Sequence, residues 1–362
     1  MNWSLIGKSK LVTISSVRQI VMLSIMLIML FAIWQCTGRE DQMVVMEGAT
    51  QGTYYRLHVV GATQGAELQK AIEQELDQID QALSLWRPGS LINRFNVADT
   101  LLELPAEDSL NAVKSHFLEN LSRSVQLSTQ TNGFFDPSLA PVIHYWGFGA
   151  DAKKPDQVDS NEINRLLNLK GLSTIQVLSE QPLRLAKVNG QQVDFNAIAQ
   201  GYTVDHLCKF LTNQGYTDFL VDIGGECRAK GDKPQSNGWS IGINMPDEKA
   251  GEDEILNIIT LKNQAISTSG NYRRFAEVNG QKVVHTIHPF TGMAYPNTLL
   301  SASVTHTQCS TADAWATALM AMGLEQAIRV AEKTSQLGIC LVYAENGQYK
   351  LFTNSAFPPL KQ

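Results

Sequence analysis

The chain has 362 residues, of which 44% are hydrophobic and 18% charged, and its formal net charge is −6. That length is enough for one large globular domain or two closely packed lobes. An acidic chain without a basic stripe is unsuited to nucleic acid. The sequence also has no CxxC pair, no Cys/His zinc spacing and no P-loop, which excludes redox-thiol, zinc-finger and Walker-type functions.

The first 36 residues have the pattern of a targeting segment. Three basic residues (Lys8, Lys10 and Arg18) precede an uncharged apolar run over residues 20–34, and Cys36 follows directly. This arrangement resembles a bacterial lipoprotein signal in which Cys36 takes the lipid; an uncleaved N-terminal anchor is the alternative. Because the basic flank stays inside, both place the body of the chain on the periplasmic side of the inner membrane. The expected division is a signal or anchor segment 1–36, a linker 37–47 and one domain over residues 48–362.

A strand and a long helix are the first predicted elements. Residues 48–60 are typical of an edge strand. Apolar residues recur at helical spacing from Leu68 to Leu83, which predicts an amphipathic helix over residues 67–85. Pro88 and Gly89 stop this helix and leave Trp86 at its end, with a core tryptophan as the ordinary interpretation.

A second helix is predicted around Phe117, where apolar residues again recur at helical spacing, and residues 131–133 end it. Phe134, Phe135 and Asp136 come next. Residues 151–160 are charged and typical of an exposed crossover between lobes, and residues 161–169 of a short helix.

Residues 183–188 and 191–195 are predicted to pair as a hairpin around an Asn-Gly turn. Its exit runs from Asp194 into a helix over residues 202–211, and small residues at such a strand-to-helix turn let the backbone approach a ligand closely. A turn or cap carboxylate is the ordinary role for Asp194. A buried strand over 219–222 and a Gly-Gly turn follow.

The remaining chain is rich in predicted strands, at 239–243, 255–261 and 299–305, with hairpins at 275–285 and 339–352. Strands and helices mix without a strict β–α–β rhythm and without GxGxxG, so a Rossmann domain is excluded. We expect an α+β fold with largely antiparallel sheets, packed helices and two intimate lobes.

The hairpin 275–285 ends at His285. Residues 267–271 are predicted to form a loop of hydroxyls and backbone N–H groups, a composition that suits phosphate oxygens. A histidine beside such a loop indicates a general base for chemistry on a phosphoryl group. A hydrogen-bonded strand histidine is the alternative.

The pair Asp313 and Thr317 lies near the start of a predicted helix capped by Ser310 or Thr311. Four residues apart, the carboxylate and hydroxyl share one helix face. Both are hard ligands that suit Mg²⁺. The alternative is a capped helix with one solvated carboxylate.

Eight segments together resemble the ApbE family, the FAD:protein FMN transferases, and they occur in the family's order from residue 48 onward. They are GATQGTYY, SLWRPGSLINRFN, GFFDPSLAPVIHYWGFG, VDFNAIAQGYTVD, VDIGGE, TSGNYRRF, HTIHPFTG and STADAWATALMAMG. The resemblance implies an ApbE-like, T-fold-like domain.

The resemblance also implies roles for single residues. It places Mg²⁺ on Asp313, Thr317 and the carbonyl of Ala197. His285 is our candidate base, and Asp136 or Asp194 is the alternative. The residues it implies for FAD binding are Gln51, Trp86, Phe134, Phe135, Asp136, Asp194, Gln200 and Ile287. Four positions depart from the family's usual residues: Gln51 replaces a methionine, Trp86 a tyrosine, Gln200 a lysine and His288 an acid.

The activity implied by the resemblance is Mg²⁺-dependent transfer of FMN, through its phosphate, from FAD to a threonine or serine hydroxyl of a partner protein, with release of AMP. The implied acceptors are periplasm-facing subunits of membrane redox complexes, such as sodium-pumping quinone reductase or its electron-transport relatives. The alternatives are an FAD pyrophosphatase, which yields FMN and AMP, and a non-enzymatic FAD-binding periplasmic lipoprotein.

Overall fold

A computed structural model describes residues 42–150, 154–247, 254–271, 275–278, 281–294 and 296–361, together with Met22 and Met26. Two predicted features lie outside the described residues. They are the targeting segment 1–36, apart from those two methionines, and the Asn279-Gly280 turn. None of the helices described is long and apolar enough to cross a membrane.

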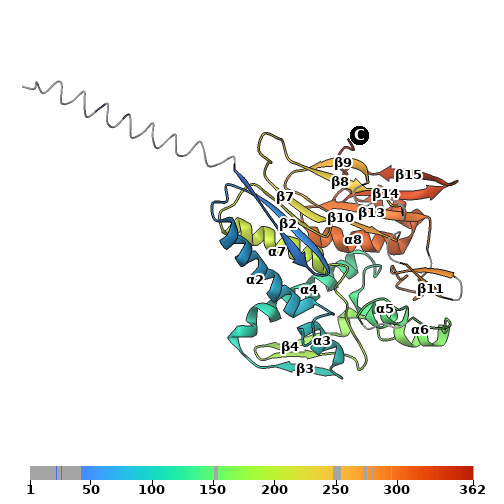
Figure 1. Ribbon diagram of the computed structural model, residues 1–362. Coiled ribbons are helices and arrows are strands. Elements are labelled where there is room, and N and C mark those ends of the chain that lie inside the picture. The colour runs from blue at the N-terminus through green and yellow to red at the C-terminus, as the bar shows by residue number, and fades with distance from the viewer. Residues whose placement is uncertain are drawn as a thin grey trace, which may run out of the picture.

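An eight-stranded sheet in the order β1-β2-β6-β7-β10-β13-β14-β15 forms the centre of the fold (Figure 1). Each of its described strand pairs is antiparallel, which confirms the predicted α+β class. Its strands are β1 (Met43–Thr50), β2 (Thr53–Val60), β6 (Phe219–Ile223), β7 (Glu226–Lys230), β10 (Ala265–Gly270), β13 (Leu299–His306), β14 (Gly338–Glu345) and β15 (Gln348–Thr353).

Two helices, α7 (Ala199–Asn213) and α8 (Cys309–Met322), contact each other and the central strands β7, β10 and β13. The predicted helix 67–85 is α2 (Gly65–Leu83), and its apolar stripe from Leu68 to Ile72 packs with α7 and β2 in one core cluster. The helix α9 (Leu324–Lys333) contacts β14, and the hairpin of β8 (Trp239–Asn244) and β9 (Ile255–Leu261) shares a cluster with β6, β7 and β10. The sheet is therefore covered by apolar contacts from both helices and a hairpin.

A second lobe lies below the sheet in Figure 1, around β3, α3 and β4. One hydrophobic cluster runs from β3 and β5 through Phe117 and Phe195 to Ala314 and Ala318 of α8, so the two lobes share a core as predicted. The elements of this lobe are α3 (Leu91–Val97), β3 (Leu101–Leu104), η1 (Asp108–Leu110), α4 (Asn111–Gln130), η2 (Pro137–Leu139), α5 (Ala140–Tyr145), α6 (Ser160–Leu167), η3 (Leu172–Thr174), β4 (Gln176–Glu180) and β5 (Leu183–Ala186).

The predicted single strand 48–60 is wrong, because these residues belong to the β1–β2 hairpin. Gln51 (φ 48°) and Gly52 (φ 74°) form its two-residue turn, and positive φ at both positions is the requirement of a type I′ turn. The sheet also includes Met43–Glu47, which lies within the range predicted as linker.

The predicted pairing of 183–188 with 191–195 is also wrong. β5 pairs with β3 and β4 instead. Residues 191–195 make no strand; the Asn96 side chain accepts from Val193 N (2.8 Å) and donates to Val193 O (2.9 Å). An amide side chain thus takes the place of a strand partner.

The predicted hairpin 275–285 is confirmed as β11 (Phe275–Val278) paired with β12 (Gln281–Val284). The predicted hydroxyl-rich loop at 267–271 is wrong, however. Its residues are mostly β10: residues 267–270 pair with β13, whereas the pairing of β10 with β7 is formed by Ala265 and Ile266.

Candidate active site

Asp313 and Thr317 face two serines of β10. The Ser267 hydroxyl lies 3.4 Å from Asp313 Oδ1, and the Ser269 hydroxyl lies 3.1 Å from Thr317 Oγ1. A helix rises about 6 Å over four residues, and a strand rises about 6.8 Å over two residues. The distance along α8 from Asp313 to Thr317 therefore matches the distance along β10 from Ser267 to Ser269. Because Asp313 is only 6% exposed, the alternative of a solvated carboxylate is wrong.

Gly201 lets the first turn of α7 approach α8 closely. A Cβ at this position would lie 2.6 Å from the Cys309 carbonyl oxygen and 2.9 Å from Asp313 Cβ. Gly201 N donates to Asp313 Oδ2 over 3.1 Å. The close contact brings the segment before α7, which includes Ala197, to the same end of α8 as Asp313.

The start of α8 is capped from another helix, so the predicted capping by Ser310 or Thr311 is wrong. Asp205 of α7 accepts from Cys309 N (2.9 Å) through Oδ1 and from Ser310 N (3.0 Å) and Ser310 Oγ (2.8 Å) through Oδ2. Arg228 pairs with the same carboxylate at 2.5 Å. Since Asp205 occupies these N–H groups, the helix terminus itself is not open to phosphate.

Glu226 is a second buried carboxylate beside Asp313. The Ser267 hydroxyl lies 3.2 Å from Glu226 Oε1, between the two acids. Burial raises the pKa of Asp313 to about 7, and burial together with the Asp313 charge raises the pKa of Glu226 well above its ordinary value. Two buried acids around one hydroxyl form a hard oxygen set that fits a divalent cation such as Mg²⁺.

Glu226 is the residue that sequence reasoning undervalued at this site. It directly follows the predicted Gly-Gly turn, but its place beside Asp313 depends on the antiparallel pairing of β7 with β10. Such a pairing across the sheet has no local signal in the sequence.

Gln51 and Gln200 lie close to the same end of α7. Gln51 Nε2 donates to Thr203 Oγ1 over 2.7 Å, and a Cβ on Gly224 would lie 3.3 Å from Gln200 Nε2. Gly224 has a φ of 61°, a conformation that favours glycine. The β1–β2 turn, the β6–β7 turn and the start of α7 therefore meet here.

Asp136 and Asp194 occupy neighbouring turns. Asp136 Oδ1 accepts from Ser138 N (3.0 Å) and so caps η2, while Asp194 N donates to Pro137 O (2.9 Å) and Asp194 Oδ1 accepts from Asn196 N (2.7 Å). Burial raises the pKa of both carboxyls. These hydrogen bonds are those of turn carboxylates, and contact of either residue with FAD stays a prediction.

The predicted aromatic contacts differ in accessibility. Trp86 is 60% exposed, so the interpretation as a core tryptophan is wrong and its ring is open for stacking. Phe135 (1% exposed) and Ile287 (6%) lie in the core, and contact of either residue with FAD stays a prediction. The partly buried Phe134 ring packs edge-on against His288, with ring centroids 5.8 Å apart.

His285 directly follows β12 and is partly buried, with its ring 6.4 Å from that of Phe148 in an edge-on arrangement. This places the candidate base in the second lobe's α5–α6 region, on the same turn as His288. The structure thus groups Asp313, Thr317, Gln51 and Gln200 around α7 and α8, and His285 and Phe134 around the 285–292 turn.

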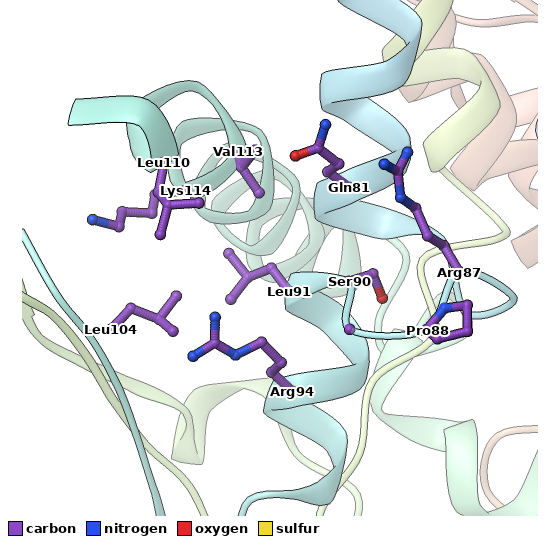
Figure 2. A pocket seen from close by; sticks show the side chains of 11 residues that line it. Gln81, Arg87, Pro88, Ser90, Leu91, Arg94, Leu104, Leu110, Val113 and Lys114 are labelled. Carbon is purple, nitrogen blue, oxygen red and sulfur yellow. The ribbon is translucent and has the colours of Figure 1, made fainter. Parts of the chain in front are cut away.

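A cavity of about 230 Å³ lies between α2, α3 and α4 (Figure 2). Arg87, Arg94 and Lys114 line it; Arg87 pairs with Asp77 at 2.5 Å, and Lys114 Nζ donates to Pro105 O. None of the predicted FAD-binding or metal residues lines this cavity, although the loop that follows Trp86 does.

Comparisons with known proteins show which family the whole chain resembles. Residues 51–341 match the model of the ApbE family. A protein of Vibrio cholerae named FAD:protein FMN transferase is 30% identical over 325 residues, which cover 89% of this chain and 93% of the relative. A protein of Escherichia coli K12 with the same name is 29% identical over 321 residues, which cover 87% of this chain and 88% of the relative.

Solved structures give the same result. The flavin transferase ApbE of Vibrio cholerae superimposes with a TM-score of 0.73 at 29% identity, covering 87% of this chain and 98% of that one. The apo flavinyl transferase ApbE of Pseudomonas stutzeri gives a TM-score of 0.75 at 29% identity, covering 87% and 96%.

Proposed function

The chain belongs to the ApbE family, and from this premise we propose that it is a Mg²⁺-dependent FAD:protein FMN transferase. It attaches FMN through its phosphate to a threonine or serine hydroxyl of a partner protein and releases AMP. The names of its relatives support flavin transfer. The observation that carries the metal-dependent mechanism is the buried Asp313 carboxylate, which faces Glu226 across the Ser267 hydroxyl.

Asp313, Thr317 and the carbonyl of Ala197 would hold the Mg²⁺, with the buried Glu226 carboxyl behind them. When bound, the ion neutralises pyrophosphate charge and stabilises the AMP leaving group. The match between the β10 serines and the α8 ligands fixes the side chains before substrate arrives, which lowers the cost of ordering them.

His285 would accept the proton of the acceptor hydroxyl as its oxygen bonds to the FMN phosphorus. The bond from that phosphorus to the AMP oxygen breaks, and AMP leaves with the electron pair. Trp86, as an exposed indole, would stack on FAD, and Gln51 and Gln200 would contact it from the turns around α7.

The acceptor and the location are further parts of the proposal. We infer periplasm-facing subunits of membrane redox complexes, such as sodium-pumping quinone reductase, as acceptors. A lipid on Cys36, or an N-terminal anchor, would hold the enzyme on the periplasmic side of the inner membrane, where such subunits present their hydroxyls.

The test incubates residues 37–362 with FAD, Mg²⁺ and a candidate acceptor domain, and then measures the acceptor's intact mass and free AMP. A mass gain of one FMN with equimolar AMP, lost in Asp313→Ala, supports the transferase. Free FMN and AMP with unmodified acceptor would instead identify an FAD pyrophosphatase. Bound but intact FAD would identify a flavin-binding protein.

A further inference from the structure

Three helices outside the proposed active site bring together a carboxylate and two imidazoles. Glu75 belongs to α2, His116 to α4 and His206 to α7, and one ligand atom of each lies within 4.8 Å of the other two. His206 Nε2 and Glu75 Oε2 are 2.6 Å apart. The two imidazole rings are edge-on, with centroids 4.8 Å apart.

The hydrogen bonds around His116 determine which of its nitrogens is free. Tyr202 donates its hydroxyl proton to Glu119 Oε2 over 3.1 Å. The Tyr202 hydroxyl oxygen therefore accepts from His116 Nδ1, 2.8 Å away. The proton of His116 is then on Nδ1, and Nε2 has an available lone pair. A histidine whose other nitrogen is held by a polar partner is the usual arrangement in metal sites.

Burial and exposure also suit metal binding. His116 is 5% exposed, so an ion bound to it would be shielded from solvent on that side. The side chains of His206 and Glu75 are 23% and 25% exposed, which leaves an entry path from solvent.

The spacing needs only a small adjustment. Ligands about 2.0–2.1 Å from a tetrahedral Zn²⁺ are about 3.3 Å from one another. The distance between His206 Nε2 and Glu75 Oε2, now 2.6 Å, must therefore increase. The largest distance between any two of the three ligand atoms, at most 4.8 Å, must decrease. Side-chain rotations on three fixed helices provide shifts of this size.

We propose that Glu75, His116 and His206 bind one divalent transition-metal ion, with Zn²⁺ as the probe and water as the fourth ligand. Two imidazole nitrogens favour Zn²⁺ over Mg²⁺, which prefers oxygen ligands, so this site differs chemically from the one at Asp313. The bound ion fastens α2, α4 and α7 to one another and stabilises the folded chain.

The test titrates Zn²⁺ into the protein in excess Mg²⁺, using the Asp313→Asn background so that the active site does not contribute. One Zn²⁺ per chain is expected, with a thermal unfolding midpoint that rises with zinc concentration. Glu75→Gln and His206→Ala should each weaken zinc binding by at least tenfold. Glu67→Gln, the same change at another residue of α2, should leave it unchanged.

Co²⁺ provides a second measurement, because the intense visible bands of a four-coordinate ion with nitrogen ligands differ from the weak bands of an octahedral oxygen site. These bands are expected in the Asp313→Asn background and absent from its His206→Ala derivative. Circular dichroism without metal establishes that each variant is folded. Zinc affinity equal in Glu75→Gln, His206→Ala and Glu67→Gln would overturn the proposal, as would no zinc binding at all.

Discussion

Replacing Asp205 with alanine should destabilise the fold and disturb the active site together. Asp205 caps α8 through two backbone N–H groups, holds the Ser310 hydroxyl and pairs with Arg228. Loss of a cap costs about 1–2 kcal/mol. Breaking a buried ion pair costs about 3–5 kcal/mol. The Arg228 side chain is 30% exposed, so solvent relieves part of the second cost.

We therefore expect Asp205→Ala to lower the free energy of unfolding by about 3 kcal/mol, measured by urea denaturation. Asp205→Asn keeps one oxygen acceptor and should lose about half as much. Because Asp313 lies one turn into α8, fraying of the first turn should also slow FMN transfer, by about tenfold or more.

Asp77→Ala is the matched control. The Asp77–Arg87 pair has the same 2.5 Å separation as the Asp205–Arg228 pair, but its side chains are 56% and 41% exposed. An exposed pair contributes about 0–1 kcal/mol. If Asp205→Ala and Asp77→Ala changed the free energy of unfolding equally, the account of α8 capping would be refuted.

Four further predictions follow from the site. Gly201→Ala should lower the thermal unfolding midpoint and weaken Mg²⁺ binding, because the new Cβ would lie 2.6 Å from the Cys309 carbonyl oxygen. A calorimetric unfolding midpoint and Mg²⁺ affinity equal to those of the wild type would contradict the close contact. His285→Ala should abolish FMN transfer while FAD binding, followed by flavin fluorescence, persists; retained transfer would remove His285 from the mechanism. Trp86→Ala should weaken FAD binding without changing stability, since the ring is 60% exposed, and Trp86→Tyr should restore it. The folded-state pKa of Asp313, about 7, exceeds the unfolded value of 3.8, so its contribution to metal-free stability is present below pH 3.8 and is lost as pH rises toward 7. The thermal unfolding midpoint should fall over this pH range, and it should fall less with Mg²⁺ or in Asp313→Asn. If the midpoint of Asp313→Asn changed with pH as that of the wild type does, the pH dependence would not come from Asp313.

Periodic elements were predictable from the sequence because their signal is local. The apolar residues Leu68, Ile72 and Leu83 of α2 are all buried, as the helical spacing required. The pairing of β11 with β12 followed from alternation around a short turn. The antiparallel α+β class followed from many short strands without crossover helices.

Features that depend on distant residues were not predictable. Asp205 caps a helix that begins 104 residues later, and nothing in the residues around Cys309 identifies the cap. The segment 191–195 resembles a strand, but the Asn96 side chain satisfies Val193 and so removes the need for a partner strand. Gln51 forms a turn that its own residue type does not favour.

The candidate site shows the same division. The spacing of Asp313 and Thr317 suggested a cation site, and the family resemblance supplied the remaining residues. What the sequence lacked was the pairing of their helix face with Ser267 and Ser269, and the buried Glu226 behind Ser267. Those contacts depend on the order of strands in the sheet.

The most direct test of the central claim measures the rate of FMN transfer against Mg²⁺ concentration for the wild-type protein and Asp313→Asn. Removing even an indirect partner of a metal ligand typically costs 10–100-fold in affinity, so losing a ligand should raise the Mg²⁺ requirement by about 100-fold or more. We predict no transfer in wild type without Mg²⁺ and this displacement in the variant. Identical Mg²⁺ curves for the two proteins would contradict the assignment of Asp313 as the residue that holds the ion.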